Sequence, residues 1–114
     1  MNRFTTCLII LLLLLVLVSC EKATKFKETD GKVPFAFTLT EEGRVFIAIN
    51  NALGHRVRTL SNNQVWPAGN HMVEWDGKND KGEKVMNGYY MLVIEVRNLT
   101  GEELYSAKGW IYLE

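Results

Sequence analysis

Residues 50–90 read NNALGHRVRTLSNNQVWPAGNHMVEWDGKNDKGEKVMNGYY, and this stretch decides the fold. Short runs in which apolar and polar residues alternate are separated by glycine-containing turns at close, regular intervals. A period of two places every second side chain on the same face of a β-strand, whereas a helix needs a period near 3.6. The stretch therefore predicts short strands joined by tight turns.

The same pattern continues on both sides of this stretch. Residues 51–54 are expected to form a hairpin loop closed by Gly54 in the left-handed region. Residues 61–70 read as a longer connection, and residues 76–84 as a polar loop. Seven strands are expected, at residues 33–39, 44–50, 56–60, 71–75, 85–88, 89–97 and 103–113. The predicted fold class is all-β: an antiparallel two-sheet β-sandwich of the immunoglobulin or fibronectin-III type.

The alternation also predicts which side chains form the core. The run at residues 89–97 is apolar on both faces, which is typical of a central, covered strand. We expect Tyr90 to bury its ring while its hydroxyl binds a nearby loop. We expect Asp76 to accept hydrogen bonds from backbone N–H groups that follow it. The predicted inward-facing residues are Phe35, Phe37, Leu39, Val45, Ile47, Ile49, Val57, Val73, Trp75, Tyr90, Leu92, Ile94 and Val96.

The 114-residue chain divides into three parts. Residues 1–19 contain an apolar run at positions 8–18, which is too short for a stable membrane span and suits the core of a helical signal peptide. Residues 20–32 are polar and charged and read as a flexible tether, which could hold the domain up to about 40 Å from its anchor. Residues 33–114 form the β-sandwich domain.

The sequence Leu17-Val18-Ser19-Cys20 resembles the lipobox of bacterial lipoprotein signal peptides. The resemblance implies cleavage after Ser19, a diacylglyceryl group on the Cys20 thiol and an acylated new amino terminus. Two lipid signals already anchor a protein stably, so a triacylated Cys20 would bind the membrane permanently. Glu21 stands where an Asp would resemble the inner-membrane retention signal of enteric bacteria. This favours the outer membrane, on its periplasmic or surface face.

Cysteine and charge counts limit the function classes. Cys7 leaves with the signal peptide and Cys20 becomes lipidated, so the domain has no thiol for a disulfide, a metal or a nucleophile. Removing residues 1–19 removes Arg3, which leaves 12 of the 13 basic side chains against 13 acidic ones. A nearly neutral domain with interspersed charges has no basic surface for nucleic acid.

Residues 45–98 resemble the immunoglobulin-like domain of the flagellar hook-capping protein family. The segments that carry the resemblance are 49–54, 57–60, 67–69, 73–77, 80–82, Val85 and 88–90. The resemblance implies an immunoglobulin-like fold and an accessory, non-catalytic scaffold role. The hook-capping role itself is not expected to transfer, because a lipidated amino terminus is foreign to that protein.

Three kinds of chemistry were weighed and not favoured. Asp76, Asn79 and Asp80 suggest a calcium loop, but the positions counted from Asp76 do not fit the EF-hand pattern. His55 and His71 lack a third zinc ligand at a suitable spacing. Ser61, His71 and Asp76 could be named as a hydrolytic set, but no nucleophile elbow positions them. We expect no enzyme activity, no cofactor and no metal site.

Two functions remain open. The first is a membrane-anchored lipoprotein that displays an immunoglobulin-like module for another protein of the bacterial envelope. The second is a lipoprotein that binds a ligand such as a glycan. The second would use Trp66, read as a loop residue, with Asn62, Asn63 and Gln64. The alternative for Trp66 is a side chain folded down over the end of the sandwich.

Overall fold

The computed structural model describes residues 31–114. The expected signal peptide, Cys20 and residues 21–30 of the expected tether lie outside the described residues. Within the described part, no helix has the length and apolar character needed to cross a bilayer.

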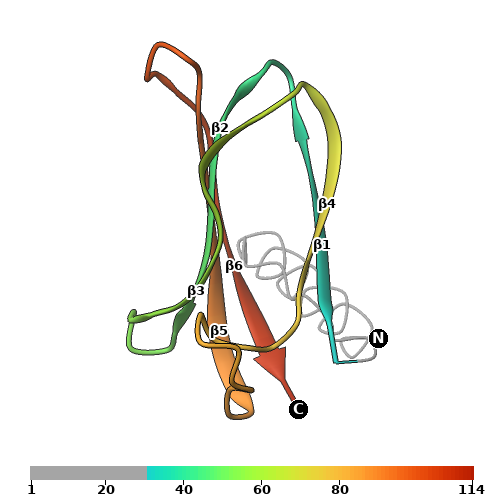
Figure 1. Cartoon of the computed structure of the whole chain (residues 1–114), viewed down its shortest axis with the longest axis vertical. Helices are drawn as coiled ribbons and strands as arrows, with labels where there is room; N and C mark the ends of the chain where they lie inside the picture. The colour runs from blue at the N-terminus through green and yellow to red at the C-terminus, as the bar shows by residue number, and fades with distance from the viewer. Residues whose placement is uncertain (1–30) are drawn as a thin grey trace, which may run out of the picture.

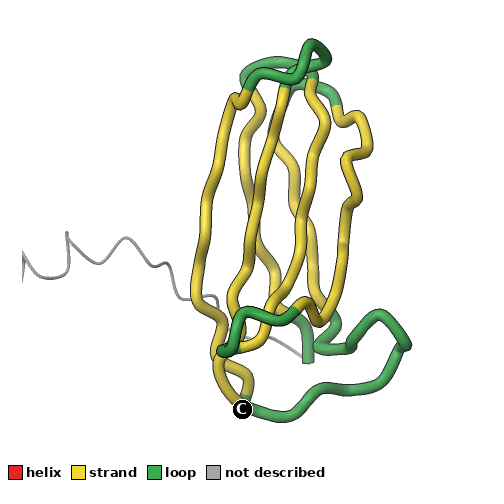
Figure 2. The backbone as a smooth tube through the Cα atoms, turned by 90° about the vertical axis from the view of Figure 1, so that its left-hand side faces the viewer, coloured by secondary structure: helices red, strands yellow, loops and turns green. Residues whose placement is uncertain are grey.

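The described chain contains six strands. They form two antiparallel sheets: β1 pairs with β4, and the other four lie in the order β3-β2-β5-β6. The two sheets face each other, and their strands run along the long axis with the loops gathered at both ends (Figures 1 and 2). This confirms the predicted antiparallel β-sandwich. The strands are β1 (Val33–Leu39), β2 (Gly43–Asn51), β3 (Arg56–Trp66), β4 (Gly69–Trp75), β5 (Gly88–Arg97) and β6 (Glu103–Leu113).

The core lies between the sheets and follows the predicted alternation. Trp75 is fully buried, its ring centroid lies 5.3 Å from that of Tyr90, and its Nε1 donates to the Lys78 carbonyl at 2.9 Å. The Tyr90 hydroxyl donates to the Met86 carbonyl at 2.6 Å, as expected of a residue that ties a loop to the core. Asp76 Oδ1 accepts from the Lys78 N–H at 3.0 Å, which confirms the predicted turn. The buried core cluster comprises Val33, Phe35, Phe37, Leu39, Val45, Ile47, Ile49, Trp75, Tyr90, Leu92, Ile94, Val96, Ile111 and Leu113.

The prediction of a separate strand at residues 85–88 was wrong. Gly88 is the first residue of β5, and residues 85–87 belong to the loop before it. Val85 N–H binds the Gly77 carbonyl at 3.0 Å, and an isolated bridge joins Lys78 to Lys84. The backbone groups of this segment are satisfied within the loop, so it adds no strand to either sheet.

Residues 61–70 are also not a long connection. β3 continues to Trp66 and β4 begins at Gly69. The pairing of β3 with β2 shifts register three times, leaving Val57, Leu60 and Asn63 without a partner in β2. Each such bulge adds a residue and breaks the period of two. The continuation of β3 beyond residue 60 was not predicted, because the alternation that indicates a strand is interrupted about every third residue.

Three hairpin loops share one hydrogen-bonding pattern, with Asn at the first position and Gly at the fourth. They are residues 51–55, 79–83 and 98–102. In each, the Asn N–H donates to the carbonyl of the fifth residue at 2.8 Å, and the Gly N–H donates back to the Asn carbonyl. The Asn Oδ1 accepts from the N–H groups of the third and fifth residues at 2.8–3.1 Å. Only the first loop, with Gly54 at φ 86°, was predicted in this form.

Candidate functional site

Three aromatic side chains gather on the face of the large sheet that points away from the small sheet. The register of β5 and β6 places Tyr89 opposite Tyr112 and Met91 opposite Trp110. The ring centroid of Tyr89 lies 4.8 Å from that of Tyr112 and 6.3 Å from that of Trp110, the latter edge to face. Edge-to-face contacts of this kind are favourable. We call Tyr89, Trp110 and Tyr112 the outer aromatic cluster.

The outer aromatic cluster is exposed and borders further apolar side chains. Tyr89 is 53% exposed and Tyr112 45% exposed. Ala48 and Val93 are buried but do not belong to the core cluster, because they lie on the outer face under their neighbours. An apolar surface of this kind on a small domain is typical of an interaction site.

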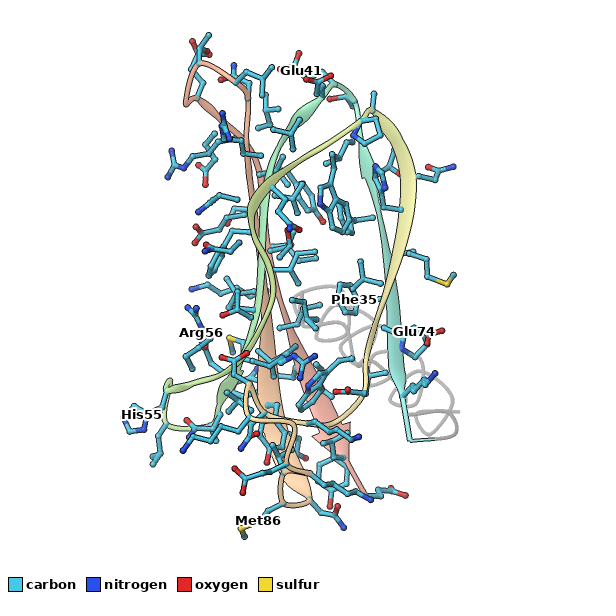
Figure 3. The ribbon with its side chains drawn as sticks, viewed as in Figure 1. Phe35, Glu41, His55, Arg56, Glu74 and Met86 are labelled. Atoms are coloured by element: carbon cyan, nitrogen blue, oxygen red, sulfur yellow. The ribbon has the colours of Figure 1, made fainter. Side chains whose placement is uncertain are left out.

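Beside this surface, a cation–π contact fixes an arginine. The Arg56 guanidinium lies 4.9 Å from the centre of the Phe46 ring, and its Nε donates to Asn50 Oδ1 at 2.9 Å. Arg56 is exposed and points away from the sandwich (Figure 3). Held in place by two contacts, this charge offers a pre-oriented partner for a carboxylate.

Trp66 lies at the end of β3 rather than in a loop. Its ring stacks on Phe37 with centroids 5.5 Å apart and meets His71 at 5.1 Å. His71 Nε2 is also 2.7 Å from the Pro67 carbonyl, which connects the β3–β4 turn to the same cluster. The half-buried Trp66 packs against the core and closes this end of the sandwich, in agreement with the folded-down alternative.

Of the three polar residues predicted to accompany Trp66, Asn62 lies on a different face of β3, whereas Gln64 pairs with the inward-facing Val45 and so shares the face of Trp66. Asn62, Asn63 and Gln64 are exposed, and Asn63 has a positive φ of 57° at a bulge. Asn62 pairs with Phe46, whose neighbours in β2 are buried, so Asn62 belongs to the outer face. Trp66 instead packs toward the core between the sheets.

The polar loop between β4 and β5 covers part of the free edge of β3. Asp80 N–H donates to the Val57 carbonyl at 3.0 Å, and Asp80 Oδ1 accepts from the Thr59 N–H at 2.9 Å. The Arg58 Nη1 donates to the Asn79 carbonyl at 2.9 Å. The oxygens that suggested calcium ligands therefore bind backbone groups, and this loop protects a strand edge.

The other residues that could act as catalytic groups or metal ligands lie apart and make separate contacts. Ser61 is buried, and its Oγ donates to the Val45 carbonyl at 2.7 Å. His55 lies at an exposed hairpin tip (Figure 3), whereas His71 lies in β4. Burial raises the pKa of the Tyr90 hydroxyl, which therefore stays protonated as a donor. The described groups of Ser61, His71 and Asp76 each bind a different backbone atom and do not act as a set.

The sequence contained a signal for the outer aromatic cluster that was not used. Tyr89, Met91 and Val93 alternate with the core residues of β5, and Trp110 and Tyr112 alternate with those of β6. A second apolar face on adjacent strands indicates a covered surface. The prediction took residues 89–97 to be covered on both faces and did not ask what lies against the outer one.

Two facing antiparallel sheets with this strand order define an immunoglobulin-like β-sandwich. A family model described as the FlgD Ig-like domain matches residues 23–100. The chain belongs to this family. No functionally curated protein matches it.

Solved structures of FlgD proteins are similar to this chain. FlgD from P. aeruginosa has a TM-score of 0.60 at 19% identity, and the match covers 78% of this chain and 66% of that one. FlgD from Xanthomonas campestris has a TM-score of 0.56 at 24% identity, with 70% and 56% covered. Truncated FlgD from Helicobacter pylori has a TM-score of 0.50 at 31% identity, with 75% and 66% covered. This chain therefore spans only part of the length of these proteins.

Proposed function

We propose that this chain is a membrane-anchored lipoprotein that displays a non-catalytic immunoglobulin-like interaction module in the bacterial envelope. The observation that carries the interaction role is the exposed outer aromatic cluster. Tyr and Trp are enriched among the side chains that dominate binding energy at protein interfaces. Lipobox-like residues 17–20 support the anchor, and outer-membrane placement rests on Glu21.

Family membership supports a structural rather than a catalytic role. The Xanthomonas campestris structure is described in connection with hook capping, essential for flagellar assembly. A protein that caps an assembly works by binding other proteins. We infer the same mode of action for this chain, with an envelope protein as the partner.

Site-specific photo-crosslinking in native membranes tests the proposal. A photoreactive amino acid at Tyr112 should capture a reproducible partner. The same group at Met72, which is 71% exposed on the outer side of the small sheet, should not. Equal capture at both positions, or none at Tyr112, would contradict the assigned surface.

Truncation measures the strength of the same contact. If Tyr89 and Tyr112 each contribute about 2 kcal/mol and the losses add, the double alanine variant should bind roughly 700-fold more weakly. Circular dichroism should show an unchanged fold, because both side chains lie outside the core cluster.

Glycan binding near Trp66 is the second candidate. Exposed amides at Asn62, Asn63 and Gln64 lie in the last part of β3, which ends at the half-exposed ring. Trp66→Ala removes a core contact, so Gln64→Ala and Asn62→Ala are the better variants. Loss of glycan-array signals in these folded variants supports this candidate, and unchanged signals exclude it.

A further inference from the structure

The outer aromatic cluster belongs to an apolar strip that follows the outer face of β5. Trp110 of the cluster lies beside Met91 in the ladder between β5 and β6. Six residue steps along β5 separate the two ends of the strip, which corresponds to about 20 Å. A helix of about 13 residues has the same length. The outer-face residues of β5, in order, are Tyr89, Met91, Val93 and then Glu95, whose carboxylate ends the apolar part.

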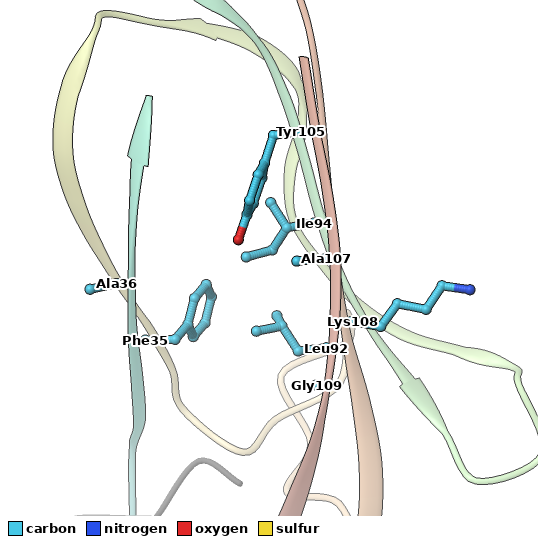
Figure 4. Close-up of a pocket in the computed structure, with 8 residues that line it drawn as sticks. All are labelled: Phe35, Ala36, Leu92, Ile94, Tyr105, Ala107, Lys108 and Gly109. Carbon is cyan, nitrogen blue, oxygen red and sulfur yellow. The ribbon is translucent and has the colours of Figure 1, made fainter. Parts of the chain in front are cut away.

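Two cationic side chains flank this strip, one on each side. Lys108 pairs with Val93 in the ladder and extends from β6 away from the core (Figure 4). Arg56 begins in β3 but leans over β2, because its Nε binds Asn50 and its guanidinium lies over the Phe46 ring. Those two residues lie on either side of the β2 residue that pairs with Val93. The two cations are therefore level with each other and about two strand spacings, or about 10 Å, apart.

Within the described residues, neither cation has a carboxylate partner. The one ion pair in this part of the chain joins Lys32 to Glu74 on the small sheet. The hydrogen bond from Arg56 to Asn50 uses Nε, which leaves both Nη groups for a bidentate bond with a carboxylate. Because the Arg56 side chain already has a fixed orientation, it loses less conformational entropy when a carboxylate binds.

We propose that this strip binds one acidic amphipathic helix of an envelope protein. The apolar residues of the helix lie against Met91, Val93 and Trp110. Carboxylates on both sides of its apolar stripe bind Arg56 on one flank and Lys108 on the other. This inference rests on the proposed interaction role of the outer aromatic cluster and specifies the chemistry of its partner.

The width of the strip favours a helix over other partners. A spacing of about 10 Å between the cations matches the diameter of a single helix with its side chains. An added strand would pair with backbone groups at a sheet edge and not with a sheet face. Residues 31–114 contain no helix, so the described part of a second copy does not supply this partner.

Sequencing the peptide captured by a photoreactive group at Tyr112, in the full chain and in native membranes, tests the proposal. We expect a segment in which apolar residues recur every three or four positions, with Asp or Glu on both sides of the stripe. A captured segment without carboxylates, one with a period of two, or one from a second copy of this chain overturns the proposal and leaves the interaction role standing. No capture at Tyr112 overturns both.

Charge removal measures the two predicted ion pairs. The captured segment, synthesised as a peptide, is titrated against the purified full chain. Arg56→Gln should raise Kd about tenfold or more, and Lys108→Gln about threefold. The matched control is Arg44→Gln, because this exposed outer-face arginine lies beyond Glu95 and should leave Kd unchanged. Equal Kd values in all three folded variants overturn the helix proposal, whereas the interaction role remains supported by the capture itself.

Discussion

Asn98 shows how a single side chain can hold a hairpin. Its Oδ1 accepts from the Thr100 N–H, the Thr100 hydroxyl and the Glu102 N–H at 2.8–3.1 Å. An amide oxygen thus replaces the backbone acceptors that a five-residue loop cannot supply itself. Asn51 and Asn79 repeat this arrangement in the other two loops.

We predict that Asn98→Ala lowers the free energy of unfolding by about 1 kcal/mol, because the loop N–H groups lose their acceptor. For a domain of this size the melting temperature should fall by about 4–8 °C. Asn98→Asp keeps an acceptor in the same place and should lose much less. Thermal unfolding followed by circular dichroism measures both, and equal losses would contradict the assigned role.

The buried Tyr90 hydroxyl should make the free energy of unfolding depend on pH. Burial raises the pKa of its hydroxyl above 10.0, so the unfolded chain loses this proton before the folded chain does. The stabilising contribution is fully present below pH 10.0 and is lost as pH rises through the raised pKa. Tyr90→Phe lacks the bond to Met86 and should be about 1 kcal/mol less stable near pH 7.

Urea unfolding of both proteins between about pH 7 and 11 measures this effect. The difference between wild type and Tyr90→Phe should narrow as pH rises past the tyrosine range. A difference that stays constant to the highest pH would show that Tyr90 does not titrate with unfolding.

Among the elements, the strands that keep a strict period could be predicted and the irregular one could not. β1, β2 and β5 keep every second side chain in the core, with Ala48 and Val93 buried in addition on the outer face, so their core residues were identified by position. β3 could not be bounded, because its bulges at Val57, Leu60 and Asn63 depend on pairing with β2. The role of Asp80 was hidden for the same reason: its partner, Thr59, lies 21 residues away.

A further prediction concerns the free edge of β3 that the Asp80 carboxylate covers. Asp80→Ala should expose the Thr59 N–H, whose acceptor is the Asp80 carboxylate. We expect its amide exchange to accelerate at least about tenfold, which corresponds to about 1.4 kcal/mol of local opening free energy. Asp80→Asn retains an acceptor and serves as the matched control. An unchanged exchange rate in Asp80→Ala would show that the loop does not protect this edge.

For the whole molecule, the two sheets have different surroundings. The small sheet carries polar groups outward, such as Thr38 bonded to Asn70 at 2.7 Å, and an exposed ion pair between Lys32 and Glu74 at 3.8 Å. The large sheet presents the outer aromatic cluster.

Replacing Cys20 tests the proposed lipid anchor. We predict that Cys20→Ala yields a product that is soluble or unprocessed, because the only group to which the lipid can attach is gone. Cys7→Ala, which changes the other cysteine of the chain, should be processed and retained in the membrane like the wild type. Membrane fractionation and intact-mass measurement distinguish these products. Normal processing and full membrane retention of Cys20→Ala would refute the lipoprotein assignment, because a domain with this near-neutral charge has no basic surface to hold it on anionic lipid.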